Sequence, residues 1–139
     1  MSPSSDAPSS SSLSEALNFT TGQIVQEIGY DDDVDLDLRD AIEDFIGGEL
    51  EDEDTQEIVD AVVLWWREGD GDLTDAMVDT LRNIDAGAPV WVMTPKAGRD
   101  GHVMPGDIQE SAGIAGLRVM SSVSVARDWT GTRLASRTN

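Results

Sequence analysis

One short loop gathers the residues best suited to binding chemistry. Residues 94–102 read Thr-Pro-Lys-Ala-Gly-Arg-Asp-Gly-His and include the only lysine and the only histidine of the chain. Lys96, Arg99 and His102, with Asp100 between them, could hold a small anion or an acidic segment of a protein partner, since charged donors bind carboxylates and phosphates. A second interpretation is that these bases attach the loop to the protein's own acidic surface.

The position of this loop supports the first interpretation. It follows residues 88–93, an apolar run of strand length. Ligands of open α/β sheets bind beyond the carboxyl ends of strands, and loops on rigid scaffolds often carry function. We therefore take the loop 94–103 as the candidate binding site.

No catalytic constellation accompanies His102. The chain has no cysteine and no second histidine, and no serine is spaced to suggest a triad. Disulfides and cysteine-based metal sites are excluded. These patterns predict no catalytic residue, no metal site and no cofactor.

Two acidic segments resemble metal loops only superficially. A calcium loop needs glycine at its sixth position and glutamate at its twelfth. Counted from Asp33, those positions hold Leu38 and Asp44, so we expect residues 31–33 to cap a helix instead. Residues 69–72, Gly-Asp-Gly-Asp, are expected to form a turn.

A phosphate-binding glycine motif is also missing. Such a motif follows the first strand and opens a helix. Here Gly29 is followed by Tyr30 and three aspartates, which would repel a pyrophosphate. Nucleotide binding of the usual kind is therefore disfavoured.

The tryptophans are predicted mainly to fill the core. Trp65 and Trp66 are adjacent in a predicted strand and must point to opposite faces of the sheet. Trp129 falls in a predicted turn, 128–131, which makes it the best candidate for a partly exposed contact with a partner.

Apolar periodicity places the elements that hold these residues. Strands of β-branched and apolar residues alternate with segments whose apolar positions recur at helical spacing. We expect a helical turn at 13–17, strands at 23–29, 58–66 and 88–93, and helices at 34–45, 73–84 and 107–115. Residues 117–125 alternate as a strand with one wet face, and residues 132–136 return as its hairpin partner.

This order predicts a single α/β domain. Alternating strands and helices form a parallel sheet with right-handed crossovers, and the final hairpin adds antiparallel strands. We expect a three-layer Rossmann-like architecture over residues 13–139. Residues 1–12 contain seven serines and two prolines and are expected to be a disordered tail.

The charge of the chain is very uneven. With 28 acidic and 9 basic residues its formal net charge is −19. Residues 1–90 hold 24 acids and 3 bases, whereas residues 91–139 hold 4 acids and 6 bases. So acidic a surface disfavours nucleic acid and anionic membranes as partners.

The chain shows no apolar run of roughly 20 residues and no features of a signal peptide, so a cytoplasmic location is expected.

Several of these segments together resemble a known family. Trp65-Trp66, the run from Trp91 to Val103, Asp107-Ile108 and the run from Trp129 to Leu134 are similar to the bacterial domain-of-unknown-function family 3052. The resemblance covers about residues 13–136 and implies a trimmed sheet of the class I methyltransferase type. The glycine motif that would hold S-adenosylmethionine is absent here, which disfavours methyl transfer.

The sequence thus favours a non-catalytic binding or regulatory protein that uses the loop 94–103. The alternative is a small enzyme with a degenerate methyltransferase-like fold acting on an anionic small molecule. In that case Lys96, Arg99, Asp100 and His102 would be its working groups. The oligomeric state is left open.

Overall fold

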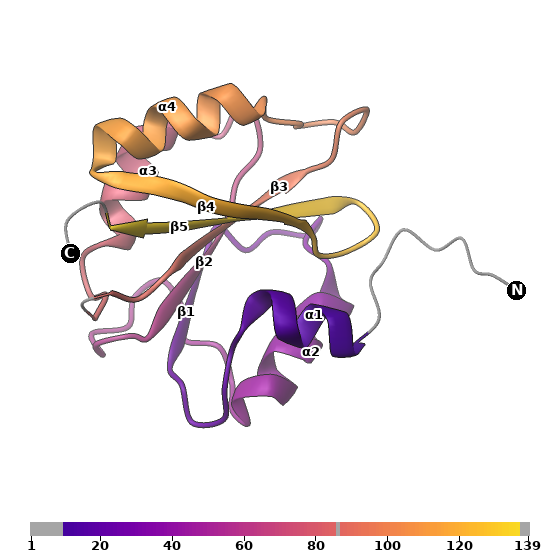
Figure 1. Cartoon of the computed structure of the whole chain (residues 1–139), viewed down its shortest axis with the longest axis vertical. Coiled ribbons are helices and arrows are strands. Elements are labelled where there is room, and N and C mark those ends of the chain that lie inside the picture. Colours follow the sequence, from indigo (N-terminus) through magenta and orange to yellow (C-terminus); the bar gives the residue numbers. More distant parts are fainter. Residues whose placement is uncertain (1–9, 86, 137–139) are drawn as a thin grey trace, which may run out of the picture.

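Helices and strands alternate along the residues that the computed structural model describes, 10–85 and 87–136 (Figure 1). The helices are α1 (Ser10–Leu17), α2 (Leu36–Ile46), α3 (Leu73–Thr80) and α4 (Pro105–Ala115). The strands are β1 (Val25–Ile28), β2 (Ala61–Trp65), β3 (Val90–Pro95), β4 (Leu117–Ser124) and β5 (Trp129–Ser136). Residues 10–12, predicted as part of the tail, belong to α1; the rest of that predicted tail lies outside the described residues.

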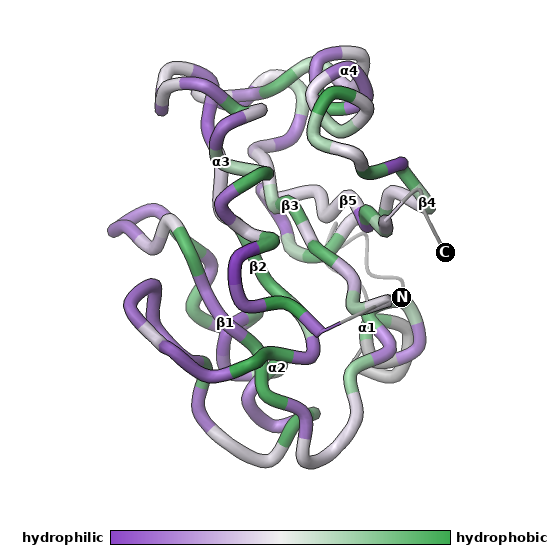
Figure 2. Tube along the Cα trace, turned by 90° about the vertical axis from the view of Figure 1, so that its left-hand side faces the viewer, coloured by the Kyte–Doolittle hydropathy of each residue, from purple (hydrophilic) through white to green (hydrophobic). Residues whose placement is uncertain are grey.

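The strands form one mixed sheet in the order β1-β2-β3-β5-β4. β1, β2 and β3 run parallel, whereas β5 is antiparallel to both of its neighbours. Figure 2 shows this order across the view, from β1 on the left to β4 on the right. The predicted α/β domain, with parallel strands followed by an antiparallel hairpin, is confirmed.

Helices cover both faces of the sheet, so the domain has three layers (Figure 1). α1 and α2 pack on one face around Trp65 and Trp91, and α3 and α4 pack on the other around Val62 and Val92. Every residue of β2 and β3 is buried because each strand is covered on both sides. Trp65 and Trp66 belong to opposite faces, as predicted.

Between α2 and β2, the chain runs along the free edge of β1. Glu51 forms a parallel bridge with Gln26 and exchanges backbone hydrogen bonds of 2.8 Å with Val25 and Glu27. This edge faces away from β2, so the connections leave β1 and β2 in opposite directions. The sheet therefore has a topological switch point between β1 and β2, where ligands of such folds usually bind.

Both ends of α2 are capped. Asp35 is the N-cap, and its side chain accepts a hydrogen bond from the backbone N–H of Leu38. The prediction that residues 31–33 provide this cap is wrong, because the chain is still extended at Asp35. Gly47 ends the helix with φ of 73°, a left-handed conformation that favours glycine.

Two predicted elements differ from the structure. α3 ends at Thr80, well before Ile84, because Ile84 forms a bridge with Val59 and its backbone is no longer helical. β4 was predicted to have one wet face, yet only Leu117 is buried and all but one of its other residues are exposed. α4 contacts this strand but buries only Leu117, and a bulge between Val119 and Ser121 disturbs its alternation.

Candidate functional site

The loop after β3 is fixed at both of its sides. The backbone N–H of Lys96 donates to the carbonyl of Asp128 at 2.9 Å, which ties the loop to the β4–β5 turn. On the other side, the N–H of Glu68 donates to the carbonyl of Gly101 at 2.8 Å. A Cβ at Gly101 would lie 3.0 Å from the Cβ of Arg67, so glycine permits this close approach.

The predicted binding residues of the loop point in different directions. Arg99 forms an ion pair of 2.7 Å with Asp128, as the second interpretation of the sequence anticipated. Lys96 is half-buried and makes no side-chain ion pair with the described residues, and Asp100 is exposed. His102 turns inward, where its Nδ1 lies 2.9 Å from the carbonyl of Pro95.

A pocket of about 320 Å³ opens beside His102, between α4 and the sheet. Its volume is at the small end of the usual range for ligand sites. None of its lining residues is acidic, although the chain carries 28 acidic residues. The lining comprises Thr94, Pro95, His102, Val103, Pro105, Ile108, Gln109, Val119, Ser122, Thr130 and Thr132.

Hydroxyl groups from neighbouring strands line the sheet side of this pocket. Thr94 of β3 pairs with Thr130 of β5, and Thr132 of β5 pairs with Ser122 of β4. Thr94 is 3% exposed and Thr132 is 6% exposed. Neither side chain forms a hydrogen bond with any of the described residues, and neither hydroxyl oxygen is fully buried. These two hydroxyls are therefore available to a ligand in the pocket.

His102 and the start of α4 add further polar groups. A carbonyl oxygen only accepts, so the Nδ1 of His102 carries the hydrogen that Pro95 receives, and Nε2 is left for another partner. Met104 caps α4 without a side-chain hydrogen bond, but its carbonyl accepts from the N–H groups of Asp107 and Ile108, which leaves only the N–H of Gly106 in this turn. Asp107 in the same turn offsets part of the helix dipole.

Trp129 does not belong to this pocket or to an exposed surface. It is 4% exposed and meets Trp65 edge to face, with ring centroids 4.8 Å apart. The prediction of a partly exposed Trp129 is wrong, because β5 begins at this residue and directs it into the core. The Asp-Trp-Thr-Gly pattern suggested a turn at 128–131, but the turn ends at Asp128 and the next three residues belong to β5.

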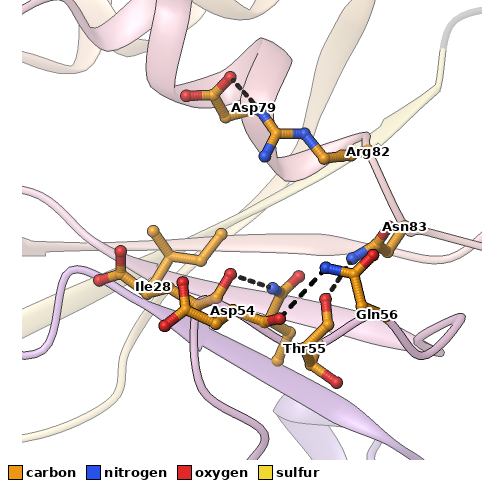
Figure 3. A pocket seen from close by; sticks show the side chains of 9 residues that line it. Ile28, Asp54, Thr55, Gln56, Asp79, Arg82 and Asn83 are labelled. Carbon is orange, nitrogen blue, oxygen red and sulfur yellow. Dashed lines mark hydrogen bonds and ion pairs between the residues drawn. The ribbon is translucent and has the colours of Figure 1, made fainter.

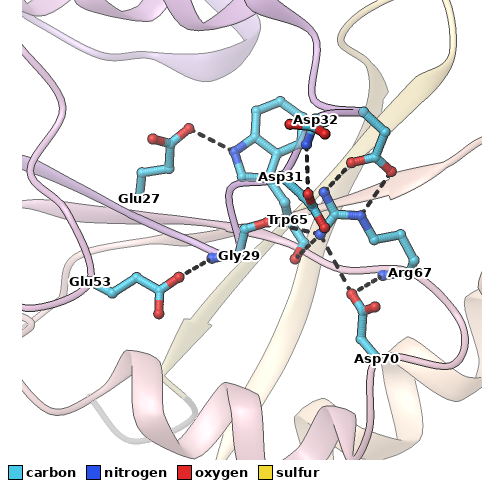
Figure 4. A network of polar contacts seen from close by, with 9 residues as sticks. Glu27, Gly29, Asp31, Asp32, Glu53, Trp65, Arg67 and Asp70 are labelled. Atoms are coloured by element: carbon cyan, nitrogen blue, oxygen red, sulfur yellow. Dashed lines mark hydrogen bonds and ion pairs between the residues drawn. The ribbon is translucent and has the colours of Figure 1, made fainter.

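The crevice at the switch point between β1 and β2 is filled by Arg67, which the sequence analysis did not single out (Figure 4). Its Nη1 donates to the carbonyl of Gly29 at 2.8 Å, and its Nε donates to Asp33 at 3.0 Å. The guanidinium carbon also lies 5.4 Å from the centre of the Trp129 ring. A Cβ at Gly29 would lie 2.3 Å from the carbonyl oxygen of Trp65, so the loop after β1 rests directly on β2.

Electrostatic interactions hold Arg67 in this crevice. The hydrogen bond from Arg67 lowers the pKa of Asp33, in spite of partial burial that raises it. Burial lowers the pKa of Arg67, but its hydrogen bond to Asp33 and the charges of Asp33 and Asp70 outweigh that effect and raise it overall. Both groups are therefore charged across the physiological pH range.

A buried carboxylate supports the same end of the sheet. Glu27 is 6% exposed, and Arg39 donates to its two oxygens at 2.6 and 2.9 Å. The indole N–H of Trp65 donates to Glu27 at 2.9 Å. The hydrogen bond with Glu27 raises the pKa of Arg39 further above its ordinary value. These groups satisfy one another, which is typical of a structural network.

A second pocket, of about 260 Å³, lies beside β1 and the segment between α2 and β2, residues 47–60, which we call the acidic connector (Figure 3). Its polar groups are largely occupied by one another. Asn83 donates to the carbonyl of Thr55 at 2.8 Å, and Arg82 pairs with Asp79 at 3.3 Å. This pocket is therefore a weaker candidate than the one beside His102.

A family model with the description "protein of unknown function (DUF3052)" matches residues 14–138. The chain belongs to the DUF3052 family. The protein is 46% identical over 128 residues to Rv2239c of Mycobacterium tuberculosis, which is described as an uncharacterised protein. That match covers 92% of this chain and 80% of Rv2239c. The resemblance drawn from the sequence is confirmed.

Solved structures place the DUF3052 fold beside class I methyltransferases. A SAM-dependent methyltransferase of Aquifex aeolicus is similar with a TM-score of 0.59 and 12% identity, over 94% of this chain and 91% of that one. CcbJ, a methyltransferase of Streptomyces caelestis, has a TM-score of 0.55 and 11% identity, over 97% and 99% of the two chains. At such identities the likeness shows the fold alone.

The residues of this chain do not fit S-adenosylmethionine at the switch point. Arg67 fills the crevice, the aspartates after Gly29 surround it with negative charge, and the loop after β1 rests on Trp65.

Among the described residues, no helix is long and apolar enough to span a membrane. Within the same residues, no group of three His, Cys, Asp or Glu side chains is arranged to hold a metal ion.

Proposed function

We propose that this DUF3052 protein is a non-catalytic binding protein for a small organic anion, and that its site is the pocket beside His102. The observation that carries the proposal is the pair of buried threonines, Thr94 and Thr132, whose hydroxyls face the pocket without a partner among the described residues. Neither hydroxyl oxygen is among the fully buried polar atoms without a partner, so both stay accessible from the pocket. A ligand that accepts hydrogen bonds can therefore reach them.

The polar lining favours an anion over a cation. Gln109 and the threonine hydroxyls offer hydrogens to an acceptor, and no carboxylate lines the pocket. The net charge of −19 opposes an anion at long range, but at physiological ionic strength this repulsion is screened beyond about 8 Å. Ile108, Val103 and Val119 would contact an apolar part of the ligand.

Butyrate and butyramide are suitable probes because they have similar shapes and only one is charged. A cavity of about 150 Å³ holds benzene, so this pocket has room for either molecule. We expect butyrate to shift the amide resonances of His102 and Ile108 in ¹⁵N–¹H spectra, and butyramide to shift them less. The absence of any shift at about 10 mM butyrate, tenfold above a millimolar dissociation constant, would overturn the site.

Two sets of variants separate binding from folding. The double variant Thr94→Val/Thr132→Val removes hydroxyls that have no partner in the described chain, so it should leave stability unchanged or higher while weakening butyrate at least tenfold. Thr80→Val is the matched control, since the buried hydroxyl of Thr80 donates to the carbonyl of Met77. It should lower stability and leave butyrate binding intact. Equal binding of butyramide would contradict the anion specificity.

Two other predictions from the sequence are kept as narrower proposals. An acidic protein segment remains a candidate partner for Lys96, which makes no ion pair with the described residues. Loss of a captured protein on Lys96→Ala substitution would support it. The enzymatic alternative is disfavoured by the filled switch-point crevice, and the cytoplasmic location stays a prediction.

A further inference from the structure

The two edges of the sheet differ in how well they are protected. An exposed edge strand offers unpaired backbone N–H and C=O groups to another chain, and proteins usually cover or charge such edges. β1 has four residues, and its free edge is bridged by Glu51 and flanked by the acidic connector. β4 has eight residues, and no other strand of the described chain pairs with its outer edge.

The surface around β4 carries few charges and includes three exposed apolar side chains. Val119 is 39% exposed, Met120 is 47% exposed and Ile114, at the end of α4, is 69% exposed. Arg118 is the only charged residue of the strand, which contains neither lysine nor proline. The bulge between Val119 and Ser121 and the charge of Arg118 are the protective features of this edge.

We propose that β4 pairs antiparallel with β4 of a second copy of this chain, so that two sheets join into one across a two-fold axis. The charge distribution is compatible with this partner. β4 and β5 belong to the part of the sequence with 4 acids and 6 bases, while β1 and β2 belong to the part with 24 acids and 3 bases. β1 and β4 are the two edges of the sheet in one copy (Figure 2), so joining two copies at β4 places their acidic ends at opposite extremes of the combined sheet.

Antiparallel pairing also suits the strand itself. In a two-fold interface the same surface meets itself, so like charges must not fall opposite each other. Arg118 is the second residue of β4. When the two strands run antiparallel, it lies opposite the serine-rich end of the partner strand. The apolar side chains of Val119 and Met120 then lie near the axis, where both copies bury them.

Sedimentation equilibrium of the full chain tests this pairing. The mass should rise from 14.9 kDa toward twice that value as the protein concentration increases from about 10 μM to about 1 mM. Association should be stronger in about 150 mM than in about 10 mM NaCl, because the Debye length falls from about 30 to about 8 Å and repulsion between the acidic ends weakens.

Matched variants locate the interface. Met120→Lys should weaken association at least tenfold, whereas Val78→Lys, the same kind of change at a half-exposed residue of α3, should leave it unchanged. In the unmodified protein, hydrogen exchange of β4 amides should slow as concentration rises, which tests the strand without any substitution. A monomer at about 1 mM protein, or a dimer insensitive to Met120→Lys with β4 exchange independent of concentration, would overturn the proposal.

Discussion

At the scale of single residues, hydrogen-bond satisfaction separates structural from functional groups. Arg67 and Glu27 have limited exposure, and each has several partners within the chain. Arg67 fills the crevice at the switch point. Thr94 and Thr132 are neutral and equally well buried, yet their hydroxyls have no partner among the described residues. The neutral threonines are therefore better candidates for binding a ligand than the charged groups.

Trp65 and Trp91 allow this criterion to be tested within the core. Both are 0% exposed and pack on the same face of the sheet. The indole N–H of Trp65 donates to Glu27, whereas that of Trp91 has no partner among the described residues. We expect Trp65→Phe to lower the free energy of unfolding by about 1–3 kcal/mol more than Trp91→Phe, because only Trp65→Phe leaves a buried carboxylate short of a donor. Urea denaturation of the two variants measures the difference, and an equal or larger loss for Trp91→Phe would contradict it.

At the scale of elements, the sequence predicted what is fixed by continuous apolar runs. β2 and β3 are covered on both faces, and their composition indicated this directly. The exposure of β4 could not be predicted in the same way, because its alternating pattern matches a half-buried strand as well as an exposed one. Its exposure depends on which strands the helices cover, which is a property of the assembled layers. The partnerless threonines were missed for a similar reason, since they meet only after β3 and β5 pair.

The N-cap of α2 is a local feature that the sequence left ambiguous. Five aspartates lie within residues 31–37, and any of them could cap the helix by composition alone. The structure selects Asp35, whose side chain accepts from the N–H of Leu38 at 2.8 Å. Asp35→Ala should lower the free energy of unfolding by about 1 kcal/mol, while Asp32→Ala should change it by less than about 0.5 kcal/mol. Thermal denaturation followed by circular dichroism compares them, and equal effects would mean that the cap is shared along the run.

At the scale of the whole molecule, the acidic charge is concentrated where it repels itself. The connector after α2 runs along β1, and the aspartates of residues 31–37 lie just before and in the first turn of α2. Like charges held close together destabilise the folded state, and the unfolded chain relieves that repulsion by expanding. Acidity here therefore costs stability, and the cost depends on ionic strength.

This cost predicts that salt stabilises the protein. At about 10 μM protein, where self-association is weak, the melting temperature should rise by several degrees between about 10 and about 150 mM NaCl. Neutralising two connector acids should give part of the same gain without salt. Asp54→Asn/Glu57→Gln suits this purpose, because neither carboxylate forms a hydrogen bond or ion pair with the described residues. The variant should melt higher than the unmodified protein at low salt and respond less to added NaCl. If both proteins respond to salt equally, the repulsion lies elsewhere, and the connector is acidic without cost to the fold.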